Sequence, residues 1–186
     1  MYSYFITSLS IVEKISDNAF FGSEDSILNV TPLTRWFGFE TAEIKFKKVY
    51  GDLTTTPAET NQALAGIKEL AKGYIQYGVA VKDTISLAAD AAAAGYQGVA
   101  LQNQTNAATK LAVLGQIDNQ KALQTTITLQ NAFGISTQDL AGTIDFLNAV
   151  ENQTVTSLDD ITTAIPKAAP VVKQLGGNVK DLAFFL

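Results

Sequence analysis

The feature that most constrains the fold is a regular succession of helix starts and glycine stops after residue 51. The motif Thr56-Pro57-Ala58-Glu59 offers a capping threonine, proline at the first helical position and glutamate at the third. Gly78 stands where a left-handed C-cap belongs, so the motif predicts a helix that begins at Pro57 and stops at Gly78. Apolar positions follow the motif at helical spacing, at Leu64, Ile67, Ala71 and Tyr74.

The same combination of helix-start residues and glycine stops predicts further helices over about 81–94, 101–114 and 119–133. These stop at Gly95, Gly115 and Gly134. We expect Gly134 to adopt the left-handed conformation between two helices, because a residue without a Cβ does so without strain.

Three more helix starts follow. Residues 136–139 (STQD) and 157–160 (SLDD) each combine a serine cap with a carboxylate in the first turn. In the helix that begins near residue 158, Pro166 and Pro170 should bend or split the axis. A last helix begins at Asn178, after a glycine stop at Gly177. The predicted fold class is therefore all-α, an irregular bundle of short helices and helical hairpins.

The composition divides the chain near Gly51. Residues 1–50 hold most of the aromatic residues and form an aromatic-rich N-terminal segment that ends in an entry helix over about 33–50. A short helix near Ser23, interrupted by Pro32, is expected before it. Residues 51–56 are a linker, and residues 57–186 are a helical-hairpin core region. Because Phe184-Phe185-Leu186 is an apolar end in an unfinished helix, we expect the core to be truncated there and the chain to be a segment of a longer helical protein.

Charge and composition limit the partners. Charged residues make up 17% of the chain and apolar residues 47%, a charge density so low that much of the surface is expected to face other protein. The formal net charge of −5 argues against specific nucleic-acid binding, which needs clustered Lys and Arg. The N-terminus lacks the basic region of a signal peptide, and Asp90, Gly95 and Gln97 interrupt the best membrane-spanning candidate.

The sequence offers no candidate for catalysis. It contains neither histidine nor cysteine, which removes the commonest general base, Ser–His and Cys–His nucleophiles and ordinary zinc ligands. Asp159 and Asp160 are neighbours that point to different sides of a helix and are interpreted as first-turn residues. Residues 95–98 (GYQG) lack the preceding strand of a phosphate loop, and residues 45–48 (KFKK) are interpreted as a solvated helix face. We therefore expect no enzyme activity and no catalytic, cofactor-binding or metal-binding residues.

Two stretches carry no charge, residues 91–109 and 122–138. Such helices need partners on more than one side. One interpretation makes them interior helices of a monomer. The other makes them a self-association surface, with Ala108 or Leu111 facing a second chain.

The order of three motifs carries a family resemblance. Residues 131–136 (NAFGIS), 156–160 (TSLDD) and 168–176 (AAPVVKQLG) resemble the core region of phage tail tape-measure proteins. That family shows a NAFG(I/L)S helix end, a TS(V/L)xDL helix start and an AAPVxxxLG segment, and Ile161 stands here where the family often has Leu. Upstream, residues 39–42 (FETA) and 49–51 (VYG) resemble the family's entry helix. The resemblance covers about residues 38–186.

The resemblance implies a structural tail component that sets tail length, sits inside the tail tube and takes part in assembly and genome ejection. It implies self-association, with threefold symmetry, and contacts with the tail tube protein, distal tail or baseplate proteins and tail-assembly chaperones. Contact with the host membrane during ejection also follows. The implied location is the virion, in the tail lumen or at the tail tip, and the host cytoplasm during assembly. Two other readings remain open: a helical protein-binding adaptor module and a membrane-active helical protein.

Overall fold

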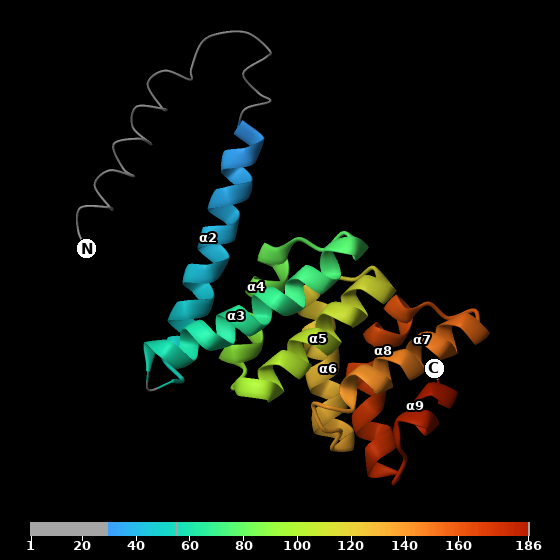
Figure 1. The fold of residues 1–186 in the computed structure, drawn as a ribbon. Helices are drawn as coiled ribbons and strands as arrows, with labels where there is room; N and C mark the ends of the chain where they lie inside the picture. Colours follow the sequence, from blue (N-terminus) through green and yellow to red (C-terminus); the bar gives the residue numbers. More distant parts are fainter. Residues whose placement is uncertain (1–29, 55, 186) are drawn as a thin grey trace, which may run out of the picture. The chain divides into compact units, whose positions relative to one another are not determined.

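The computed structural model describes residues 30–54 and 56–185, and this part of the chain is all-α, which confirms the predicted fold class (Figure 1). The helix expected near Ser23 lies outside the described residues. The elements are α2 (Val30–Gly51), α3 (Pro57–Tyr74), the 3-10 turn η2 (Ile75–Tyr77), α4 (Val81–Ala93), α5 (Gly98–Gly115), α6 (Asn119–Phe133), α7 (Leu140–Gln153), α8 (Leu158–Gln174) and α9 (Val179–Phe185).

The chain divides into two compact units, Met1–Gly38 and Phe39–Leu186. Of the first unit the structure describes only the helical residues 30–38. None of the described helices combines the length and the apolar character needed to cross a membrane.

Local capping explains where most of these helices begin and end. Thr56 accepts a hydrogen bond from the Glu59 N–H, and Ser157 accepts one from the Asp160 N–H. Gly78 and Gly134 are left-handed, with φ of 82° and 68°. Each of these four features confirms the prediction from sequence, because caps depend only on residues within about one turn.

Two predicted stops are displaced by one residue. Helix α5 runs through Gly115, and Gln116 takes the left-handed position with φ 49°. At the end of α8 the left-handed residue is Gly176 and not Gly177. A Cβ on Gly177 would lie 2.6 Å from Val172 Cγ1 and 3.0 Å from the Val172 carbonyl oxygen, so this glycine permits a close approach.

Helix α8 is not split at its prolines. It continues through Pro166 and Pro170, which are both exposed. On the other side of the helix every fourth or third residue is buried, and these contacts hold the helix against the bundle. The buried positions are Leu158, Ile161, Thr162, Ile165, Ala169 and Val172.

The core consists of two hydrophobic clusters that meet on α5. The first cluster joins the end of α2 with α3, α4 and α5, and includes Phe46, Ile67, Ile85 and Leu101. The second joins α5 with α6–α9, and includes Leu111, Leu129, Ile144, Leu147 and Leu182. Helix α5 therefore occupies the middle of the bundle and contacts α3, α4, α6, α7 and α8 (Figure 1).

This position corrects the expectation that Ala108 or Leu111 faces a second chain. Both side chains are completely buried among the chain's own helices. The lack of charge in residues 98–109 follows from the central place of α5, which has neighbours on nearly every side.

Polar contacts fix the C-terminal half of α2 to the bundle. Lys45 forms an ion pair of 2.6 Å with Asp90 on α4, and Glu43 pairs with Lys68 on α3. The Tyr50 hydroxyl accepts a hydrogen bond of 3.0 Å from the Gly98 N–H at the start of α5. The entry helix thus belongs to the same compact unit as the hairpins from Phe39 onward.

Candidate functional site

The charged residues singled out in the sequence have structural partners. Asp160 Oδ2 lies 2.6 Å from the Ser157 hydroxyl and completes the cap of α8. Asp159 pairs instead with Lys121 on α6. The two carboxylates therefore point to different partners, as their positions on the helix predict.

The basic run at residues 45–48 has a mixed character. Phe46 is completely buried and stacks on Tyr50 with ring centroids 5.3 Å apart. Lys47 and Lys48 are exposed, and Lys45 is engaged with Asp90. The run is therefore one turn of α2 that buries its aromatic residue and exposes its lysines, so only the lysines fit the prediction of a solvated face.

The loop at residues 95–98 joins α4 to α5. The Tyr96 hydroxyl lies 2.5 Å from Gln130 Oε1 on α6, which ties the loop to the bundle. Burial raises the pKa of Tyr96 above its ordinary value. The loop is a helix-to-helix turn. Among the described residues no three His, Cys, Asp or Glu side chains gather as a metal site would require.

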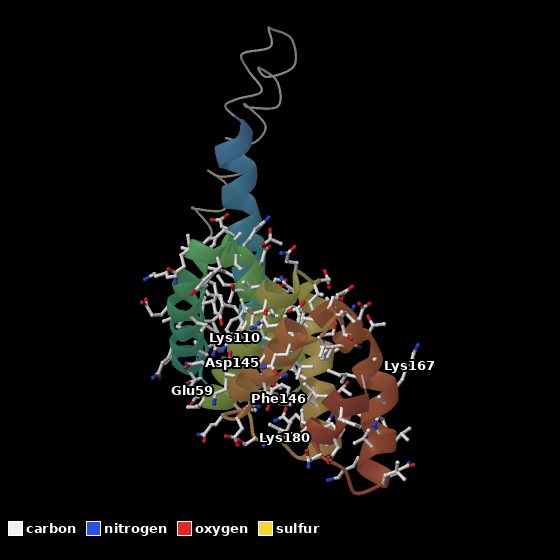
Figure 2. All side chains as sticks on the ribbon, turned by 90° about the vertical axis from the view of Figure 1, so that its right-hand side faces the viewer. Glu59, Lys110, Asp145, Phe146, Lys167 and Lys180 are labelled. Atoms are coloured by element: carbon white, nitrogen blue, oxygen red, sulfur yellow. The ribbon has the colours of Figure 1, made fainter. Side chains whose placement is uncertain are left out.

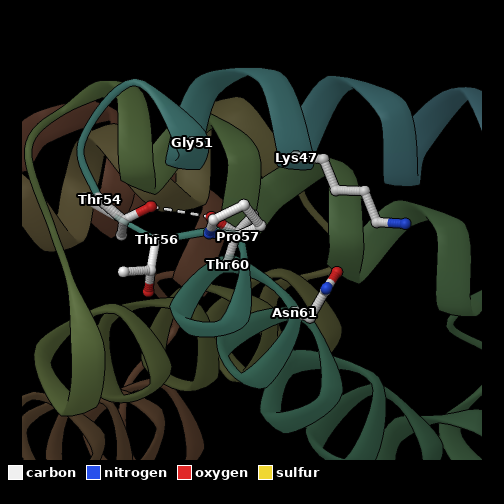
Figure 3. Close-up of a pocket in the computed structure, with 7 residues that line it drawn as sticks. All are labelled: Lys47, Gly51, Thr54, Thr56, Pro57, Thr60 and Asn61. Atoms are coloured by element: carbon white, nitrogen blue, oxygen red, sulfur yellow. Dashed lines mark hydrogen bonds between the residues drawn. The ribbon is translucent and has the colours of Figure 1, made fainter.

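A pocket lies at the turn between α2 and α3, with a cavity volume of about 390 Å³ (Figure 3). Its three threonine hydroxyls are already used by the turn. Thr54 and Thr60 share a hydrogen bond of 2.8 Å, shown as the dashed line in Figure 3, and Thr56 caps α3. Because these hydroxyls hold the backbone in place, we interpret this pocket as structural.

A second hollow lies between α5 and the C-terminal end of α3, and its features point to a binding role. We call it the tyrosine groove. It has a volume of about 520 Å³. Its lining is mainly apolar and aromatic, with polar groups at the edge: Glu69, Leu70, Gly73, Tyr74, Tyr77, Asn106, Lys110, Val113 and Leu114.

Tyr74 is the fixed element of the groove. Its hydroxyl lies 2.6 Å from Asn106 Oδ1 and 3.1 Å from the Asn106 carbonyl oxygen on α5. Burial raises the pKa of Tyr74 to about 12, with smaller contributions from Tyr77 and Asp145. The phenol therefore stays protonated near neutral pH and can keep donating to Asn106.

Tyr77 is the accessible element. It is 62% exposed, and its ring centroid lies 6.2 Å from that of Tyr74. Lys110 Nζ lies 2.5 Å from Asp145 Oδ1 on α7, so the cation at the edge is neutralised by the chain itself (Figure 2). Tyrosine offers a large apolar surface with a polar end and is enriched at protein interfaces. The groove is thus suited to an apolar or aromatic side chain of another protein.

Sequence reasoning missed this groove. The helical spacing places Tyr74 in the apolar stripe of its helix and gives no role to Tyr77. The available signal was the spacing of the two tyrosines immediately before Gly78, which places both rings on one side of the helix end.

Taken together, the fold and the hollows define an all-helical bundle whose accessible features are suited to contacts between proteins. Residues 55–186 match the family of phage-related minor tail proteins, and the chain belongs to that family. It is a phage tail protein with a structural role, and its place is the virion. No curated protein and no solved structure matches the chain.

Proposed function

We propose that this member of the phage minor tail family acts as a tape-measure protein. The observation that supports the proposal most strongly is the ordered series of motifs that resembles the tape-measure core, which falls within the region matched to the family. Residues 131–136 span the end of α6, residues 156–160 span the start of α8, and residues 168–176 span its end. All three motifs therefore occupy helix boundaries of one bundle, and α7 lies between the first motif and the second.

In this role the chain would sit in the tail lumen or at the tail tip. It would self-associate there and contact the tail tube protein, distal tail or baseplate proteins and tail-assembly chaperones. The tyrosine groove supports contacts of this type, because it offers aromatic surface beside a fixed hydroxyl. During ejection the chain would leave the tail and meet the host membrane.

We further propose that the chain has no enzyme activity. The support is its complete lack of histidine and cysteine, the ion pair of Asp159 with Lys121 and the capping role of Asp160. Peptidoglycan cleavage by the purified chain, lost on substitution of a single Asp or Glu, would contradict this.

Tail length is the decisive measurement. If the bundle opens into extended helix inside the tail, where a helix advances about 1.5 Å per residue, a helical insert of about 40 residues should lengthen the tail by about 60 Å. The insert belongs in the turn between α7 and α8, at Val155, whose side chain is fully exposed. Tail lengths are measured by electron microscopy of phage that carry the insert. Infective particles of unchanged tail length would contradict the ruler role.

The adaptor reading makes a different prediction. As an adaptor, the chain would leave tail length unchanged, and Tyr77→Ala would abolish capture of one tail protein. The membrane-active reading is tested by flotation of the chain with liposomes, which it would have to accompany to the top of a density gradient.

A further inference from the structure

Helix α8 turns one side away from the bundle, and we call this side the α8 face. It is formed by Ala164, Lys167, Ala168, Val171 and Leu175, which recur at the three- and four-residue spacing of one helix side. Val171 is 55% exposed and Leu175 is 79% exposed. A hollow of about 620 Å³ lies along this side, and the described residues that line it belong to α8 or, in the case of Leu175, follow its last residue directly.

Two charged side chains line the hollow, Asp160 and Lys167. The Asp160 carboxylate accepts a hydrogen bond from the Ser157 hydroxyl in the cap of α8, whereas the cation of the α8 face has no such partner among the described residues. Lys167 lies one turn from Ala164 and from Val171, and no carboxylate of the described residues forms an ion pair with it. Figure 2 shows Lys167 projecting away from the bundle. By contrast, Lys110 and Lys121 are paired with Asp145 and Asp159. An unpaired cation between apolar residues is complementary to a carboxylate on an apolar helix.

A second copy of this chain fits the α8 face poorly. If two antiparallel copies of α8 paired Lys167 with Asp160, Val171 would lie opposite residue 156, which precedes the helix. If the two Val171 side chains met instead, Leu175 would lie opposite Lys167. In a parallel pair, Lys167 would face Lys167. Each of these three registers therefore leaves an apolar residue uncovered or a cation without a counter-charge.

We propose that the α8 face is a docking site for an amphipathic helix of a different protein, which carries Asp or Glu opposite Lys167 and apolar side chains opposite Val171 and Leu175. The carboxylate pairs with the lysine, and the apolar side chains fill the hollow beside it. This inference does not depend on the tape-measure role, because it rests only on the exposed residues of α8.

The test uses the full chain and a fluorescein-labelled synthetic helix of about 20 residues, long enough to be helical when built on alanine. Its apolar stripe is Leu and Ala, with Glu at the centre. A matched peptide has Lys at the central position, and a third has the same composition in scrambled order. Binding is measured by fluorescence anisotropy.

We expect the Glu peptide to bind at least about fivefold more tightly than the Lys peptide, because attraction is replaced by repulsion. Lys167→Glu should reverse this preference, and Val171→Asp should abolish binding of both peptides. Lys173→Glu is the matched control, since it makes the same charge change on the same helix about 120° away. Circular dichroism confirms that each variant is folded.

Three results would overturn the proposal. Equal affinity for the Glu and Lys peptides would show that Lys167 does not select the charge of the partner. If neither peptide binds the wild-type chain, the α8 face is not a docking site for such a helix. A dimer in sedimentation that Val171→Asp dissociates would show that a second copy occupies the α8 face instead.

Discussion

The side-chain amide nitrogen of Gln104 lies 2.9 Å from Thr126 Oγ1 and joins α5 to α6 in the completely buried interior. The other end of the amide is unsatisfied, because Gln104 Oε1 has no hydrogen-bond partner in the described part of the chain. The Thr126 hydroxyl itself donates to the Leu123 carbonyl oxygen over 2.8 Å. If Gln104 is replaced, the Thr126 hydroxyl therefore still has an acceptor for its proton.

This arrangement predicts opposite results for two substitutions. Gln104→Met keeps the volume and removes an unsatisfied acceptor, so the free energy of unfolding should stay within about 1 kcal/mol of wild type or increase. Gln104→Ala opens a cavity and should lower it by about 2–4 kcal/mol. Urea unfolding measures both. If both variants lose the same free energy of unfolding, the hydrogen bond from Gln104 to Thr126 stabilises the fold by more than the unsatisfied Gln104 Oε1 destabilises it.

Backbone conformation predicts how substitutions at two helix ends and at one position inside a helix change the free energy of unfolding. Gly134→Val should lower the free energy of unfolding by about 1–2 kcal/mol, because φ is 68° there. Gln116→Gly should raise it by about 0.5–1 kcal/mol, since Gln116 adopts φ 49°. Gly142→Ala is the control: Gly142 lies inside α7 with open space around its Cα, and alanine there should stabilise. Thermal unfolding ranks the variants, and a stable Gly134→Val would contradict the capping account.

The sequence was most informative where structure is decided locally. The predicted helix over about 119–133 is confirmed, because its stop at Gly134 is decided within a few residues. The structure adds the cap at its start, where Asp118 accepts hydrogen bonds from the first turn. The burial of Leu140, Ile144 and Leu147 also follows from their spacing on α7.

Features that depend on distant residues were not predictable in the same way. The role of Gly177 depends on its approach to Val172, and the burial of Leu111 depends on helices on several sides of α5. The tyrosine groove forms only when α3 packs beside α5, because Asn106 supplies the partner of Tyr74. Spacing within one helix contains no information on which other helix covers it.

The burial of Leu111 reverses the expected effect of a charge at this position. Leu111→Glu should unfold the chain, with a loss of more than about 4 kcal/mol in the free energy of unfolding, because an unpaired carboxylate would enter the second cluster. The control is Val99→Glu, because Val99 is 66% exposed near the start of α5. Circular dichroism and urea unfolding distinguish the outcomes. A folded Leu111→Glu chain that merely dissociates would restore the self-association reading for this residue.

The raised pKa of Tyr74 predicts a loss of stability in alkaline solution. Below the ordinary tyrosine pKa of about 10 the phenol is protonated in both the folded and unfolded chain, so it contributes no pH dependence there. Between pH 10 and about 12 the unfolded chain loses this proton and the folded chain keeps it. The folded state then binds more protons, and the free energy of unfolding falls as pH rises through this window.

Tyr74→Phe should therefore show a smaller decrease in stability between about pH 9 and about pH 11 than the wild-type chain does. At neutral pH the same variant should lose about 1 kcal/mol, because the hydrogen bond to Asn106 is removed. Tyr77→Phe is the matched control, since Tyr77 is largely exposed and shares the same helix end. Urea unfolding at the two pH values gives the differences, and lysine titration, which also occurs in this range, cancels between the variants. If the two phenylalanine variants lose stability equally with rising pH, the desolvation of Tyr74 does not control this transition.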